Sequence, residues 1–60
     1  MNTEEFKMWV IDNIKKNPTL KSDIIDLYRL ALSEIEEGGS ERNEIDHAIH
    51  DINELINENV

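Results

Sequence analysis

The sequence predicts an all-α fold, a small three-helix unit in which a short N-terminal helix precedes an antiparallel helical hairpin. Apolar residues recur every three or four positions in three segments, at about 3–16, 19–37 and 41–57. A proline separates the first two segments, and a glycine pair separates the last two. Sixty residues make a single domain, 1–60, with a thin core. Because there is no cysteine to form a disulfide, helix packing or dimerisation is left to complete it.

The first helix, 3–16, has clear start and stop signals. Asn2 with Glu5 three residues later is typical of a capping box, and the pair Asn17-Pro18 ends the segment. Its apolar residues at helical spacing are Phe6, Trp9, Val10 and Ile14. The start of the second helix, 19–37, has two candidate caps, Asn17 and Thr19, and the sequence does not choose between them. The stripe of this helix comprises Leu20, Ile24, Leu27, Tyr28, Ala31 and Ile35.

The connection between the second and third helices is predicted to be a tight turn. Gly38 follows the last periodic residue, where a left-handed residue commonly ends a helix, and Ser40 stands where its hydroxyl can cap the next one. The third helix, 41–57, has one apolar side, made of Ile45, Ala48, Ile49, Ile52, Leu55 and Ile56. A phosphate cradle at the glycines is disfavoured, because glutamates flank the turn on both sides.

The net charge of −8 is confined to the second half of the chain. Residues 1–29 carry five bases and five acids, whereas residues 30–60 carry one base, Arg42, and nine acids. A helix-turn-helix DNA reader would need a basic third helix, whereas this third segment is acidic, so direct nucleic-acid binding is not expected. An acidic face is instead suited to a basic partner protein, and its candidate residues are Glu34, Glu37, Glu41, Glu44, Asp51 and Glu54.

Neither metal nor catalytic chemistry is predicted. His47 and His50 share a helix face with two carboxylates, but three-residue spacing alone is weak evidence for a metal site, and a solvated face explains it. No serine has a recognisable base beside it. We therefore expect no enzyme, no cofactor and no metal.

Membrane association is not expected either. The first helix combines a tryptophan with lysines, but Glu4, Glu5 and Asp12 interrupt it. No apolar run is long enough to cross a bilayer, and the first residues carry acids where a secretory signal carries bases. The expected location is the cytoplasm.

An excess of apolar residues is the most informative functional feature. The second helix carries an apolar arc of roughly 220°. One interpretation makes it the middle helix, covered on both flanks. The other leaves an exposed interaction patch drawn from Met8, Trp9, Ile11, Ile25, Leu30 and Leu32. The leading hypothesis is a non-enzymatic interaction or regulatory protein that self-associates, most simply as a homodimer. The alternative is an acidic inhibitor or decoy that binds a basic nucleic-acid-binding or enzyme surface.

Overall fold

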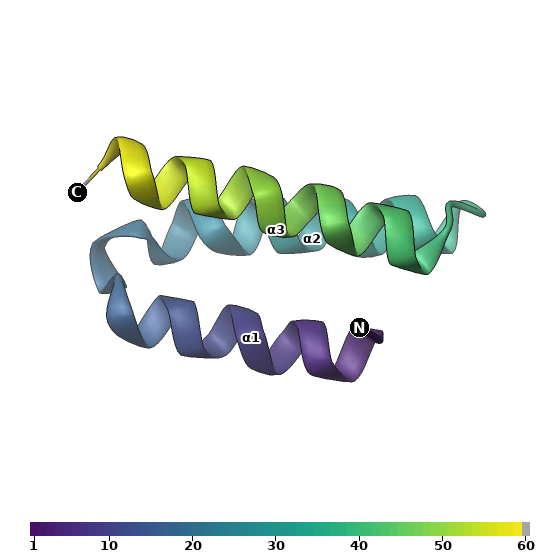
Figure 1. Ribbon diagram of the computed structural model, residues 1–60, viewed down its shortest axis with the longest axis horizontal. Coiled ribbons are helices and arrows are strands. Elements are labelled where there is room, and N and C mark those ends of the chain that lie inside the picture. The colour runs from purple at the N-terminus through teal and green to yellow at the C-terminus, as the bar shows by residue number, and fades with distance from the viewer. Residues whose placement is uncertain (60) are drawn as a thin grey trace.

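The computed structural model describes residues 1–59 and consists of three α-helices: α1 (Thr3–Lys16), α2 (Lys21–Glu36) and α3 (Glu41–Glu58). Residue 60, the last of the predicted domain, lies outside the described part. No strand occurs within residues 1–59, so the all-α prediction is confirmed. In Figure 1, α2 and α3 form an antiparallel hairpin, and α1 lies alongside it. Contact is most extensive between α2 and α3 and least between α1 and α3.

Helix α1 is bounded by side-chain hydrogen bonds, as the sequence predicts for its start. The amide oxygen of Asn2 accepts the backbone N–H of Glu5 at 2.9 Å, and the backbone N–H of Asn2 donates to the Glu5 carboxylate at 3.0 Å. These two bonds confirm the capping box. At the other end, the Asn17 side chain donates to the carbonyl oxygen of Asn13 at 3.1 Å, which closes the last turn.

Helix α2 begins two residues later than predicted, and neither candidate cap forms a side-chain hydrogen bond to it. Asn17 precedes Pro18 at the N-cap position of a 3-10 turn instead. Residues Pro18–Leu20 form a single 3-10 turn, in which the Leu20 N–H donates to the Asn17 carbonyl at 3.0 Å. Leu20 stands at the N-cap position of α2, with no side-chain hydrogen bond to the helix. The predicted start was wrong because the Asn17 side-chain amide donates to the Asn13 carbonyl of α1 instead. A 3-10 turn stands where a side-chain cap was expected.

The connection between α2 and α3 has the predicted turn chemistry. Gly38 has a left-handed φ of 105°. The Gly39 N–H donates to the Glu34 carbonyl at 2.9 Å and the Gly38 N–H to the Ile35 carbonyl at 3.1 Å, the two bonds of a Schellman motif. The Ser40 hydroxyl then accepts the N–H of Asn43 at 3.4 Å. Gly38, Gly39 and Ser40 therefore each have a specific role in this connection.

The core is small and formed by all three helices. Its buried residues are Phe6, Val10, Ile24, Ala31, Ile45, Ala48 and Ile52. Ala31 and Ala48 lie on facing sides of the α2–α3 seam, and their small side chains let these two helices approach closely. No charged or polar residue is buried among residues 1–59. Burial of apolar surface is consequently what holds the helices together.

The rings of Phe6, Trp9 and Tyr28 join α1 to α2. Phe6 is fully buried, with its ring centroid 5.3 Å from that of Tyr28 and 6.4 Å from that of Trp9. Both distances lie in the range of favourable aromatic pairs. This cluster forms part of the contact between α1 and α2, together with the buried Val10.

Candidate functional site

Helix α2 is the middle helix of the fold, with α1 packed against one flank and α3 against the other. Ile24 and Ala31 are buried by these neighbours. Ile25 and Leu32 stay half-buried, and Leu30 is 58% exposed. The neighbouring helices thus absorb part of the apolar excess on α2, and the remainder lies on two separate flanks.

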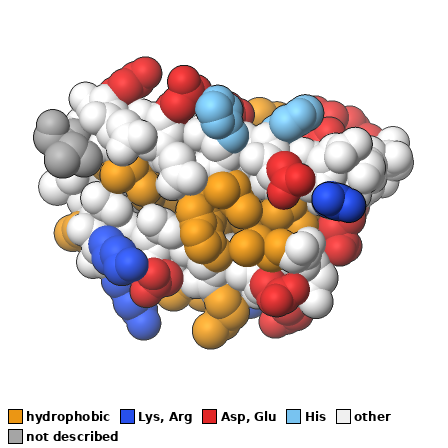
Figure 2. Space-filling view, in the orientation of Figure 1, with side chains coloured by type: hydrophobic (Ala, Val, Ile, Leu, Met, Phe, Trp, Pro, Cys, Tyr) orange, Lys and Arg blue, Asp and Glu red, His pale blue; other side chains and the backbone are white. Residues whose placement is uncertain are grey.

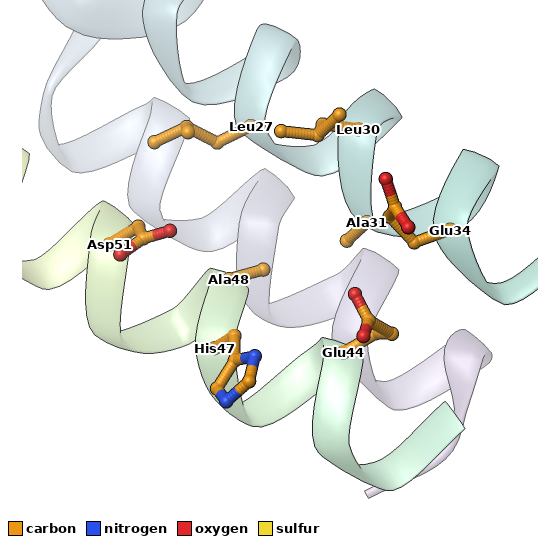
Figure 3. A pocket seen from close by; sticks show the side chains of 8 residues that line it. All are labelled: Leu27, Leu30, Ala31, Glu34, Glu44, His47, Ala48 and Asp51. Atoms are coloured by element: carbon orange, nitrogen blue, oxygen red, sulfur yellow. The ribbon is translucent and has the colours of Figure 1, made fainter. Parts of the chain in front are cut away.

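The first flank is a shallow groove of about 230 Å³ between α2 and α3, which we call the acidic groove (Figure 3). Ala31 and Ala48 lie in it, with Leu27 and Leu30 alongside on α2. Its polar lining residues are Glu34, Glu44, His47 and Asp51. Three carboxylates and no lysine or arginine therefore surround an apolar floor, so the groove attracts positive charge.

The second flank lies between α1 and α2 and consists of two adjoining grooves, of about 490 and 260 Å³. Lys7 and Tyr28 line both grooves, so the two form one continuous surface, which we call the mixed-charge face. The larger groove is also lined by Thr3, Glu4, Leu32, Ile35 and Glu36. The smaller one is also lined by Val10, Ile11, Ile14, Ile25 and Arg29. Charged lining residues of both signs occur here in equal number.

The six candidate interface residues do not gather in one patch. Ile11, Ile25 and Leu32 lie on the mixed-charge face, whereas Leu30 lies in the acidic groove. Met8 is 65% exposed and Trp9 is half-buried, and neither lines these grooves. Figure 2 shows a further hydrophobic area between α3 and α1.

Lys7 and Arg29 are site residues that the sequence interpretation missed. Both border apolar side chains on the mixed-charge face. The signal was present, because Lys7 is four residues before Ile11, and Arg29 is four residues after Ile25. A search for charged residues four positions from each surplus apolar residue would have identified both.

The six acidic candidates divide in a similar way. Glu34, Glu44 and Asp51 all line the acidic groove, Glu34 from α2 and the other two from α3 (Figure 3). Glu37 and Glu41 flank the turn at the end of the hairpin. Glu54 lies 3.6 Å from the exposed side chain of His50, one turn earlier on α3. In Figure 2, acidic side chains border the upper edge of the molecule, over α3, and its right-hand end.

The described residues form open grooves, but they form neither a cluster of metal-ligating side chains nor a membrane-spanning helix. Within residues 1–59, no three side chains of the metal-ligating types His, Asp and Glu come together. The same residues contain no helix of the length and hydrophobicity needed to cross a membrane. Each groove is open to solvent, with apolar side chains in its lining. Such surfaces are typical of sites where another protein docks.

No family model, curated protein or solved structure matches this chain. What the protein does must therefore be inferred from its own surfaces.

Proposed function

We propose that this is a small, acidic, non-enzymatic protein that acts by binding proteins, and first of all a second copy of itself, through apolar helix faces. The observation that carries the proposal is the apolar surface left over after the helices pack. Met8 is 65% exposed, Leu30 58% and Ile11 37%. Large side chains exposed next to half-buried ones mark interaction sites.

The small size of the chain favours self-association as the simplest use of that surface. A 60-residue chain buries a smaller share of its surface on folding than a larger domain does. Among residues 1–59 the buried core has seven residues, two of them alanines. A second copy would bury further apolar surface and add stability without new secondary structure. A cytoplasmic location is part of this proposal.

Light scattering over a wide range of protein concentration tests self-association. We expect a mass of about 14 kDa, twice the 7.0 kDa of one chain, and a melting temperature that rises with concentration. A mass of one chain at every concentration, with a constant melting temperature, would contradict the proposal.

The acidic groove favours a second candidate function, that of an inhibitor or decoy for a basic protein surface. Glu34, Glu44 and Asp51 surround the exposed Leu30, so the groove offers both charge and apolar contact to a nucleic-acid-binding protein or enzyme. Such a complex should weaken steeply between about 50 and 200 mM salt. Replacing Glu41 and Glu44 together by lysine should abolish it. Binding that survives this double change would rule out the decoy.

A further inference from the structure

We propose that the second copy docks on the mixed-charge face, with the two α2 helices antiparallel about a two-fold axis beside Tyr28. The inference rests on the proposed self-association and specifies its surface and register. A homodimer of this kind is isologous, so the same residues of both copies meet. The surface must therefore be complementary to itself, and the two flanks of α2 differ in this respect.

The acidic groove is not self-complementary. A symmetric contact there would bring three carboxylates from each copy together, with no lysine or arginine among the lining residues. Like charges placed opposite one another in an interface oppose association. The mixed-charge face has Lys7 and Arg29 as well as Glu4 and Glu36. It is the flank on which a second copy meets opposite charges.

The charges on the mixed-charge face are ordered along its length. Glu4 and Glu36 line the groove at one end, and Arg29 lines the groove at the other. Lys21 lies four residues before Ile25, so it extends the same flank of α2 beyond that basic groove. The face is thus acidic at one end and basic toward the other.

The spacing along α2 fits a two-fold axis at the centre of this face. Ile25 and Leu32 are equally far from the midpoint between Tyr28 and Arg29, and so are Lys21 and Glu36. When a second α2 lies antiparallel across that midpoint, Leu32 of each copy meets Ile25 of the other. At both ends of the contact, Glu36 of one copy then meets Lys21 of the other. Apolar contact lies at the centre and opposite charges lie at the rim, as in stable interfaces.

The molecule has room for such a contact. A standard interface takes about 800 Å² from each partner, which is roughly one fifth of the 4279 Å² that the chain exposes. The mixed-charge face follows α1 from Thr3 to Ile14 and α2 from Ile25 to Glu36, about 17 Å along each helix. This is about half of the longest dimension of the molecule, 33 Å. A contact along this face therefore suits a dimer.

Two leucines of α2 provide a matched test of the face. Leu32 lies on the mixed-charge face and Leu30 in the acidic groove. We expect Leu32→Glu to weaken dimerisation at least thirtyfold, because it places a charge in the apolar centre. Leu30→Glu, the same change on the same helix, should alter the dissociation constant less than threefold. Sedimentation equilibrium measures both. An intact Leu32→Glu dimer, or an equal loss in Leu30→Glu, would overturn the proposal.

A second variant separates loss of the dimer from loss of the fold. Ile11 is already 37% exposed in a single chain, so Ile11→Glu should retain its helical circular dichroism. It should nevertheless weaken the dimer, because Ile11 lies on the mixed-charge face. If Ile11→Glu and Leu32→Glu both stay folded and dimeric, the second copy does not dock on the mixed-charge face.

Charge exchange tests the two-fold register. Lys21→Glu alone puts two glutamates opposite each other at both ends, and Glu36→Lys alone puts two lysines there. Each variant should dimerise roughly tenfold more weakly at low salt. Both changes suit the α2 dipole, so neither should harm folding. In an equimolar mixture every end pair is again opposite in charge, and the heterodimer should recover wild-type affinity within threefold. No recovery would overturn the register.

Glu58→Lys makes the same charge change as Glu36→Lys at the far end of α3, and it should not weaken the dimer. A mass that grows beyond two copies would contradict the two-fold arrangement, because only a head-to-tail contact continues to add copies. A wild-type chain that stays monomeric would instead refute the self-association on which the inference rests. The wild-type measurement therefore distinguishes the two failures before any variant is made.

Discussion

The two connections of this chain both reverse its direction, but they do so by different means. Between α1 and α2, one 3-10 turn at Pro18–Leu20 suffices, and no side chain caps the start of α2. Between α2 and α3, a left-handed glycine, a glycine pressed against the helix and a serine cap occupy consecutive positions. The first connection is therefore formed mainly by backbone hydrogen bonds, whereas the second requires particular residues at positions 38, 39 and 40.

This difference also bears on the acidic groove. A Cβ atom added at Gly39 would lie 2.8 Å from the carbonyl oxygen of Glu34 and 3.1 Å from the Cγ of Glu44. These two glutamates are the ones that face each other across the groove. A side chain at Gly39 would therefore press against the backbone of Glu34 and the side chain of Glu44. Substitutions in the two connections should differ accordingly, and all should be compared at one protein concentration.

Gly39→Ala should have the largest effect. The added methyl group clashes with backbone, which cannot rotate away, so the turn must shift and strain its bond to Glu34. We expect a loss of about 2–3 kcal/mol in the free energy of unfolding. Thermal unfolding followed by circular dichroism measures it. A loss smaller than that of Gly38→Ala would contradict this account of the turn.

Gly38→Ala should cost less, about 1–2 kcal/mol, because only its backbone conformation resists the change. No atom lies within 4 Å of a Cβ at this position, but φ is 105°. A domain of this size should lose roughly 5–15 °C of melting temperature. Gly38→Asn is the matched control. It should be destabilised less than Gly38→Ala, because asparagine tolerates left-handed conformations better than alanine does.

Ser40→Ala removes the cap of α3 and should cost about 0.5–1 kcal/mol. The lower part of the usual range is expected, because the bond from the Asn43 N–H is long, at 3.4 Å, and exposed. Ser33→Ala, a change of the same size at an exposed position inside α2, should be neutral or slightly stabilising. Equal losses in the two variants would mean that the Ser40 hydroxyl contributes nothing as a cap.

Thr19→Ala should have the smallest effect, below about 0.5 kcal/mol. Thr19 is exposed within the 3-10 turn and makes no side-chain hydrogen bond as an N-cap. Urea unfolding of this variant beside Ser40→Ala compares the two connections directly. A larger loss of stability in Thr19→Ala than in Ser40→Ala would mean that the first connection depends on its side chains more than the second does.

The three helices and the second connection could be predicted because their signals are local. Gly38 and Ser40 act through their own backbone and side-chain chemistry, which is visible in the sequence. The start of α2 could not be predicted, because Asn17 has two possible uses. Its amide donates back to the carbonyl of Asn13. Only the folded structure shows with which of the two helices the side chain of such an asparagine forms its hydrogen bond.

The fate of the surplus apolar residues was less predictable. Helical spacing places Leu30 and Leu32 on opposite flanks of α2, but it does not tell how far α1 and α3 cover them. Coverage depends on the distance between helix axes, which Ala31 and Ala48 help to set at the α2–α3 seam. The separation of the six candidates into different surfaces is accordingly a tertiary result.

The aromatic cluster that joins α1 to α2 allows the docking of α1 to be followed by intrinsic fluorescence. Trp9 is the single tryptophan, and its ring neighbours Phe6, which in turn contacts Tyr28. Helix α3 contains no tryptophan, tyrosine or phenylalanine. Intrinsic fluorescence should therefore follow the docking of α1, while far-ultraviolet circular dichroism follows all three helices. If the two signals change at different temperatures, α1 detaches before the hairpin melts; if they coincide, the chain unfolds as one cooperative unit.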